Sequence, residues 1–362
     1  MSQANVEALQ YVGYARETGG ILAVVRALAG TGEFRCVLGV GPGFRPKQPP
    51  LPALELPALA PEEIGFASFR RARAVAEAIR PWLNARNRVF HGRSRAGLLV
   101  AFWLRLLGER RVVATVHCLG RQRWFYRTMG SLLRDRLYWL GPAMKRYYGV
   151  PVDASDPWAQ CLPDCVPLGA VASVLPVRHR SATIFGCVGA CVPVKNWELV
   201  LRAAAEIPRE MPIRFVHAGG EDDTAASAAY AGELRRIQAE LGLAGRFEWR
   251  GQVEDLSAFW REIDCLIVAS RWEAFSMAAL EAAAAGVPVL APDASGTADL
   301  VASGGGWLFP ADSAAGLATT MARLVGTGEL GRWQRDERLL ARFLAPTVAA
   351  QHRRVYQQLL AR

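Results

Sequence analysis

Two carboxylates flank the start of an alanine-rich segment, and their spacing suits the recognition of hydroxyl groups. Glu273 lies in a short loop, and Glu281 follows about two turns into the segment that begins at Ser276. If this segment is helical, its first backbone N–H groups are free to bind an anion. A sugar nucleotide offers a diphosphate for the helix end and hydroxyl groups for the two carboxylates.

The chain on either side predicts a βαβ unit that positions these residues. Ile263–Ala269 and Val287–Leu290 are short apolar runs typical of buried parallel strands. Ser276–Ala285 favours a helix, which Ser276 can cap and Gly286 can end in the left-handed conformation. We therefore expect the loop before Ser276 at the carboxyl end of a strand, where open α/β sheets bind ligands.

Length, composition and charge limit the class of protein. A chain of 362 residues predicts two domains. Its net charge of +10 is uneven, because residues 1–165 hold 23 Lys and Arg against 12 Asp and Glu. The first half is therefore expected to meet an anionic partner, although no nucleic-acid module is evident. Seven scattered cysteines, and the lack of a signal peptide or a membrane-spanning run, predict a cytoplasmic protein without a metal site.

The run from Glu273 to Glu281, followed by Ala-Gly-Val-Pro-Val, resembles the E-x7-E signature of retaining glycosyltransferases of family 4, the glycosyl transferases group 1. The resemblance implies an α/β protein of the GT-B fold, with two Rossmann-like, doubly wound domains facing a central cleft. It implies an acceptor-side and membrane-side domain over 1–164, a donor-binding domain over 165–342, and a C-terminal helix over 343–362 that packs back on the first domain.

The implied reaction is transfer of a sugar from a nucleoside-diphosphate sugar, with a UDP-sugar expected, to a saccharide or lipid-linked acceptor. The anomeric configuration would be retained, and neither a cofactor nor a metal is implied. By resemblance, Lys195 stabilises the leaving diphosphate, Glu273 binds sugar hydroxyls, Glu281 binds the ribose, and His117 faces the donor sugar at the end of a predicted strand. Further donor contacts are implied for Gly19, Gly20, Gly219, Val253, Phe275, Ser276 and Met277.

One position departs from the family pattern. The family has an arginine directly after the glycine that ends the first strand of the donor domain, and this chain has Ala190. Arg271, Arg121 and Arg16 are possible replacements, and the sequence does not choose among them. Two alternatives to a transferase therefore stay open: a nucleotide-sugar epimerase of the same fold and a catalytically weakened nucleotide-sugar binder. A dinucleotide dehydrogenase is disfavoured, because no G-x-G-x-x-G follows a first strand.

Basic and aromatic residues alternate over residues 119–149. Aromatic rings suit a membrane–water interface, and basic residues suit an anionic leaflet. Arg121, Arg123, Trp124 and Arg127 are the predicted membrane or acceptor surface, and the first two arginines can also reach the cleft. The alternative is a core of aromatic rings with solvated arginines outside it. The predicted setting is the inner face of the cytoplasmic membrane, in polysaccharide or lipopolysaccharide assembly.

Overall fold

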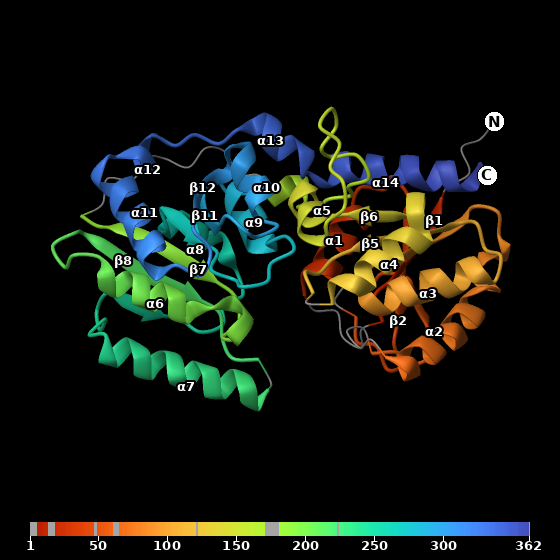
Figure 1. Ribbon diagram of the computed structural model, residues 1–362, viewed down its shortest axis with the longest axis horizontal. Coiled ribbons are helices and arrows are strands. Elements are labelled where there is room, and N and C mark those ends of the chain that lie inside the picture. The colour runs from red at the N-terminus through yellow and green to blue at the C-terminus, as the bar shows by residue number, and fades with distance from the viewer. Residues whose placement is uncertain are drawn as a thin grey trace. The chain divides into compact units, whose positions relative to one another are not determined.

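The computed structural model describes residues 6–13, 19–46, 49–60, 65–120, 122–170, 181–222 and 224–361, apart from the side chains of Ser303 and Leu339. Contacts divide the chain into two units, the first made of Met1–Leu168 with Arg342–Arg362 and the second of Gly169–Ala341. The domain boundaries predicted from the sequence were 164/165 and 342/343. Each unit contains a parallel sheet of six strands with helices beside it (Figure 1).

The sheet of the first unit has the strand order β3-β2-β1-β4-β5-β6. Its strands are parallel, and the order in which the chain adds them reverses between β1 and β4. Its central strands are buried apolar runs, as expected for a parallel sheet covered on both faces. The strands are β1 Glu7–Tyr11, β2 Arg35–Val40, β3 Ala53–Glu55, β4 Arg88–Gly92, β5 Val112–Val116 and β6 Leu137–Trp139.

The helices of the first unit form two groups. Helix α3 packs against α2 and α4, whereas α1 packs against the C-terminal helix α14. Helix α14 also contacts β4, and its Tyr356 hydroxyl accepts a hydrogen bond of 3.0 Å from Gln10 Nε2 on β1. The helices are α1 Gly20–Ala29, α2 Phe66–Ile79, α3 Arg95–Leu106, α4 Arg123–Leu133, α5 Pro142–Tyr148 and α14 Ala345–Leu360, with short 3-10 turns at η1 Trp82–Asn84 and η2 Arg134–Arg136.

The sheet of the second unit has the strand order β12-β11-β10-β7-β8-β9. Its strands are parallel, and the order in which the chain adds them reverses between β7 and β10. Its strands are β7 Thr183–Val188, β8 Ile213–Ala218, β9 Phe247–Trp249, β10 Cys265–Ile267, β11 Val289–Pro292 and β12 Gly306–Phe309.

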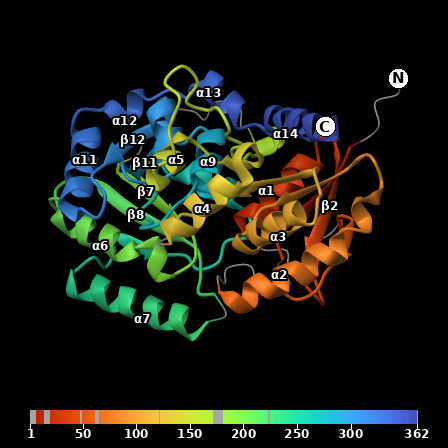
Figure 2. The same ribbon diagram turned by 45° about the vertical axis from the view of Figure 1, so that its right-hand side comes forward.

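One core of the second unit lies between its sheet and α6, α7 and α11, with Trp197 and Phe215 among its buried side chains. Helix α6 packs against α7 and α11, and both views draw α6 between the strands and α7 (Figure 1 and Figure 2). The helices are α6 Trp197–Glu206, α7 Ala225–Glu240, α8 Leu256–Glu262, α9 Met277–Ala284, α10 Ala298–Leu300, α11 Ala314–Gly326, α12 Glu329–Arg332 and α13 Glu337–Arg342; short turns are η3 Leu168–Ala170, η4 Pro193–Lys195 and η5 Val301–Gly305.

The predicted strand–helix–strand unit around residue 276 is confirmed as β10, α9 and β11. Ser276 caps α9, because its Oγ accepts a hydrogen bond from the Ala279 N–H at 3.2 Å, and Gly286 has φ +78°. The short edge strand β3 lies inside a proline-rich stretch of the first unit. Among the described residues, no helix has both the length and the apolar character needed to cross a bilayer.

Candidate functional site

The predicted phosphate-binding lysine and the first predicted sugar-binding carboxylate form an ion pair in the second unit. Lys195 ends the short turn η4 after β7, and Glu273 lies in the loop after β10. Lys195 Nζ is 3.0 Å from Glu273 Oε2, and Ser270 Oγ donates a hydrogen bond of 2.9 Å to the same oxygen. These loops leave the carboxyl ends of the two strands between which the sheet order reverses, and ligands bind at such a point in open α/β sheets.

The backbone holds the loop that carries Glu273 on both sides. The Arg271 N–H donates to the Val194 carbonyl at 2.9 Å, which ties this loop to the turn of Lys195. The Gly296 N–H donates to the Glu273 carbonyl at 2.8 Å, and a Cβ on Gly296 would lie 1.6 Å from the Ala274 carbonyl oxygen. Glycine at this position therefore allows the loop after β11 to pack against the loop after β10.

Helix α9 begins directly beside this pair. Phe275 and Ser276 are buried and Met277 is partly exposed, so the capped first turn is firmly packed. Because the Ser276 hydroxyl serves one backbone N–H, the other N–H groups of the first turn stay available to an anion.

Glu281, the predicted ribose ligand, lies on the same helix. Its side chain is partly buried, and burial raises the pKa of its carboxyl above the ordinary value. No described residue donates a hydrogen bond to this carboxylate. A hydroxyl group of a ligand would therefore supply an interaction that the protein itself leaves open.

Close backbone contact shapes the next two loops of the same edge. Gly219 follows β8 with φ +149°, and a Cβ there would lie 1.9 Å from the Gly189 carbonyl oxygen after β7. The Gly219 N–H donates to the Gly251 carbonyl at 2.8 Å, next to the partly exposed Val253. The predicted donor residues of the second unit thus all follow carboxyl ends of its strands.

Ala190 has no cationic side chain where the family pattern has an arginine, and its backbone carbonyl takes part in packing. This carbonyl accepts a hydrogen bond of 3.0 Å from the Trp197 indole. Of the possible replacement cations, Arg271 is exposed and follows β10, whereas Arg16 and Arg121 lie outside the described residues.

Three predicted residues lie at the carboxyl edge of the first sheet. Gly19 has φ +89° and precedes α1, whose first residue is Gly20, so the glycines open the helix as predicted. His117 follows β5, but its side chain is only 2% exposed. Its Nε2 lies 3.2 Å from Arg93 Nη1, and its Nδ1 lies 3.3 Å from Asp164 Oδ1.

Arg93 and Asp164 are residues that sequence reasoning missed. Arg93 follows β4 directly, so a scan for charged residues at strand ends is a signal that would have found it. Asp164 carries no local signal, because it lies in an irregular segment far along the chain from His117.

The basic and aromatic stretch is mostly core. The rings of Phe125, Tyr126, Trp139 and Tyr148 are buried, and the Tyr126 and Tyr148 centroids are 4.6 Å apart. For these rings the interpretation as a membrane surface was wrong, because α4 turns one apolar side toward the sheet. The outward side of α4 carries three of the four predicted surface residues: Arg123, whose guanidinium lies over the Tyr147 ring, Trp124, which is 64% exposed, and Arg127. Arg121 lies outside the described residues.

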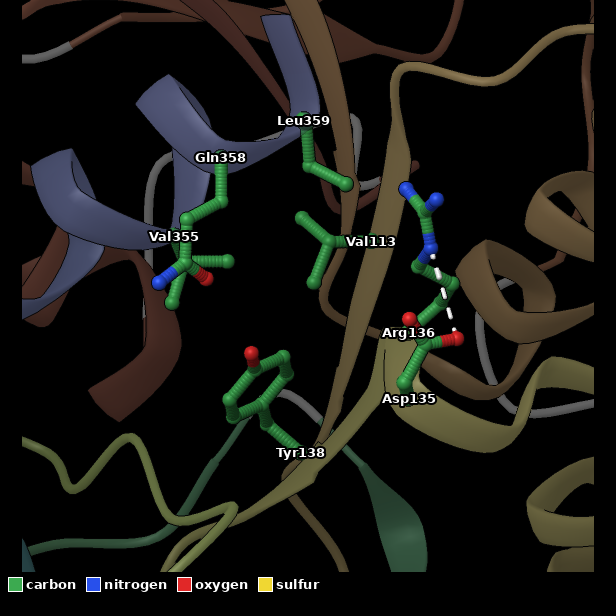
Figure 3. Close-up of a pocket in the computed structure, with 7 residues that line it drawn as sticks. All are labelled: Val113, Asp135, Arg136, Tyr138, Val355, Gln358 and Leu359. Carbon is green, nitrogen blue, oxygen red and sulfur yellow. Dashed lines mark ion pairs between the residues drawn. The ribbon is translucent and has the colours of Figure 1, made fainter. Parts of the chain in front are cut away.

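A small cavity under α14 is not a substrate site. Figure 3 shows its lining, in which Val113 and Tyr138 of the sheet face Val355 and Leu359 of the helix, with Arg136 to one side. Its volume of about 20 Å³ accommodates one water molecule. Within the described ranges, no three His, Cys, Asp or Glu side chains gather in a way that could hold a metal ion.

Comparison with known proteins identifies the second unit. Residues 182–327 match the family model of glycosyl transferases group 1. The lipopolysaccharide core biosynthesis mannosyltransferase LpcC of Rhizobium leguminosarum bv. viciae is 28% identical over 236 residues, which cover 62% of this chain and 64% of the relative. The match thus spans less than two thirds of that relative.

Two solved structures have the same fold at low sequence identity. Sucrose-phosphate synthase from Thermosynechococcus elongatus has a TM-score of 0.77 with 21% identity, covering 99% of this chain and 100% of that one. Anabaena HepE, solved with UDP and glucose, has a TM-score of 0.75 with 16% identity, covering 98% and 100%. Residues 182–327 are therefore a glycosyl transferases group 1 domain, in a chain that has the GT-B fold.

Proposed function

We propose that this protein transfers a glycosyl unit from a nucleoside-diphosphate sugar to a saccharide or lipid-linked acceptor. The observation that carries the proposal is the cluster of Lys195, Ser270 and Glu273 beside the start of α9. A cation, a carboxylate and a set of free N–H groups meet there, at the reversal point of a sheet that belongs to a glycosyl transferases group 1 domain.

Each group of the cluster has a role in this reaction. Cleavage of the bond between sugar and diphosphate leaves negative charge on a phosphate oxygen, and Lys195 with the α9 amides stabilises that charge. When the diphosphate binds Lys195, Glu273 is free to accept hydrogen bonds from sugar hydroxyls. Glu281 accepts from the ribose.

We further propose that the configuration of the anomeric carbon is retained and that the donor phosphate takes the acceptor's proton. Both ring nitrogens of His117 already face protein groups, which favours a mechanism without a base at that position. No metal is required, because Lys195 and the helix amides supply the positive charge.

The relatives suggest the class of substrate. The Rhizobium relative is named as a mannosyltransferase of lipopolysaccharide core biosynthesis, so a mannosyl donor and a lipopolysaccharide-type acceptor are proposed here. Binding to the inner face of the membrane through α4 fits such an acceptor. A UDP-sugar, the donor expected from the sequence, stays the alternative to be tested against it.

The first experiment is a donor panel on the full chain. Thermal shift with UDP-, GDP- and ADP-sugars should identify one donor, and a coupled assay with lipopolysaccharide core acceptors should show its consumption. NMR of the product then gives the anomeric configuration. Donor binding without any consumption would instead support the weakened binder suggested by Ala190, and conversion of the free donor to an epimer would support the epimerase.

A further inference from the structure

A buried polar network lies in the first unit and joins the carboxyl ends of three strands to α14. Its centre is Arg93, which is only 1% exposed and directly follows β4. Such a buried guanidinium is costly unless its N–H groups are satisfied. The members are Gln10 on β1, His91 and Arg93, Thr115 and His117, Asp164, and His352 and Tyr356 on α14.

The guanidinium of Arg93 donates to three side chains from different parts of the chain. Nε donates to Gln10 Oε1 at 2.6 Å, and Nη2 lies 2.9 Å from His352 Nε2. Nη1 lies 3.2 Å from His117 Nε2. Because a guanidinium has no acceptor, both histidine nitrogens must accept, and both rings must be unprotonated at Nε2.

For His352 the other ring nitrogen gives the same assignment. His352 Nδ1 is 2.9 Å from the Val348 carbonyl, which can only accept, so His352 carries its proton on Nδ1. His117 Nδ1 lies 3.3 Å from Asp164 Oδ1 without a hydrogen bond, so the proton on its Nδ1 follows from the Arg93 contact at Nε2. Both rings are therefore neutral Nδ1–H tautomers in this structure.

Helix α14 holds Arg93 and His91 through two side chains one helical turn apart. His352 accepts from Arg93, and the Tyr356 hydroxyl lies 2.7 Å from His91 Nδ1 while accepting from Gln10 Nε2. His91 Nε2 in turn lies 2.7 Å from Thr115 Oγ1 on β5, two residues before His117.

Burial favours the neutral form of His117. Burial lowers its pKa most, Asp164 acts in the opposite direction, and the Arg93 charge lowers the pKa further. His91 and His352 also face this group and are themselves held neutral, since burial and Arg93 lower the pKa of each. Tyr356, Cys36 and Cys165 complete the titratable surroundings of Arg93, and burial raises the pKa of each above its ordinary value.

We propose that Arg93 is a positioning residue that fixes His117 as a neutral Nδ1–H tautomer, and that α14 completes this arrangement through His352 and Tyr356. His117 then has no free lone pair and cannot remove the acceptor's proton. The catalytic part of this inference rests on the function proposed above, whereas the protonation state does not. Helix α14 thus helps to hold the side chains at the carboxyl edge of the first sheet in place.

The test is a long-range 1H–15N spectrum of the full chain labelled at histidine. The sequence has five histidines, so single substitutions suffice to assign the signals. We expect His117 and His352 to be protonated on Nδ1 only, with no titration between about pH 6 and 8, around the ordinary histidine pKa. A His117 that titrates in this range, or that carries its proton on Nε2, would overturn the proposal without affecting the assignment of donor binding.

Variants separate positioning from folding. In Arg93→Met, His117 should lose its tautomer preference and its pKa should rise, because the neighbouring positive charge is gone. His217 in the second unit is the internal control, since its ring packs between Trp197 and Trp249 and should not change. If the His117 tautomer stays fixed in Arg93→Met, Asp164 alone holds the ring and the role of Arg93 is refuted.

A matched pair on α14 keeps the test valid even if Arg93→Met fails to fold. His352→Gln keeps an acceptor for Arg93, and His352→Leu removes it. With an active donor, His352→Leu should lower kcat by about 10²-fold through misplacement of the edge, with a much smaller change in KM, and His352→Gln should restore most of it. Equal kcat values in the two variants would overturn the proposed role of α14 at this site.

Discussion

Lys195 carries the highest expected cost of a single substitution. It is the cation that pairs with Glu273, and Ala190 stands where the family pattern has a second cation. We expect Lys195→Ala to lower kcat by about 10²–10³-fold, the cost of removing one preorganised group that stabilises developing charge. Arg202→Ala is the control, because Arg202 is exposed and pairs with Glu198 on the nearby α6. Near-normal turnover of Lys195→Ala would show that another cation stabilises the leaving diphosphate.

The partly buried Glu281 carboxylate is expected to lower the free energy of unfolding while serving the proposed binding of the donor. Burial raises the pKa of its carboxyl, so the folded chain holds this proton more tightly than the unfolded chain. Stability is therefore lost as pH rises from the ordinary pKa through the raised one. Glu281→Gln should raise Tm at pH 7 by about 1–3 °C. The gain should shrink near pH 4, where the carboxyl is largely protonated in both the folded and the unfolded chain.

The same variant should bind donor about tenfold more weakly, because a neutral amide is a poorer acceptor than a carboxylate. Differential scanning calorimetry at both pH values and titration calorimetry with the donor measure the two effects. A Tm gain that is equal at pH 4 and pH 7 would mean that the charge of Glu281 is not its cause.

Candidate site residues could be predicted from the sequence where they belong to one local motif. Glu273, Ser276 and Glu281 share one loop and one helix, so their spacing alone placed them. Arg93 and His352 are separated by 259 positions, and their contact depends on how α14 packs, which no local spacing encodes. The burial of His117 escaped prediction for the same reason.

At the scale of elements, the cap of α9 links stability to binding. Ser276→Ala removes the acceptor for the Ala279 N–H and should cost about 1 kcal/mol of unfolding free energy. Ser313 caps α11 in the same way, with Oγ accepting from the Gly316 N–H at 2.9 Å. Ser313→Ala should therefore lose similar stability in urea unfolding while keeping donor affinity. Ser276→Ala should lose both if α9 presents its amides to the diphosphate as proposed; an unchanged donor Kd in Ser276→Ala would contradict this role of α9.

Strands and helices with long patterns were predictable, and short edge elements were not. β10, α9 and β11 follow from apolar runs separated by a capped helix. β3 has only three residues inside a proline-rich stretch, and an edge strand tolerates the missing N–H groups of proline. Its pairing with β2 depends on register with a neighbour, which a three-residue run does not specify.

At the scale of the molecule, the uneven charge predicts which part of the chain would bind an anionic membrane. The excess of Lys and Arg lies in residues 1–165, and α4 presents Arg127 beside the exposed Trp124. Trp124→Ser with Arg127→Ser should weaken binding to vesicles containing anionic lipid by about tenfold or more, since each basic contact is worth about 1 kcal/mol. Arg209→Ser with Leu308→Ser removes one exposed cation and one exposed apolar side chain from the second unit and should bind as wild type. Equal cosedimentation of both variants would make the outer side of α4 structural only.

The first unit is built from two separate pieces of chain, and this has a consequence for biogenesis. Residues 342–362 complete its core, yet the ribosome makes them only after the whole of residues 169–341. Until then, Gln10, His91 and Arg93 lack the imidazole and phenol of α14. The second unit can therefore mature during translation, whereas the first must wait for residues 342–362. Stalled or truncated translation products should consequently be substrates for chaperones and proteases through their amino-terminal half.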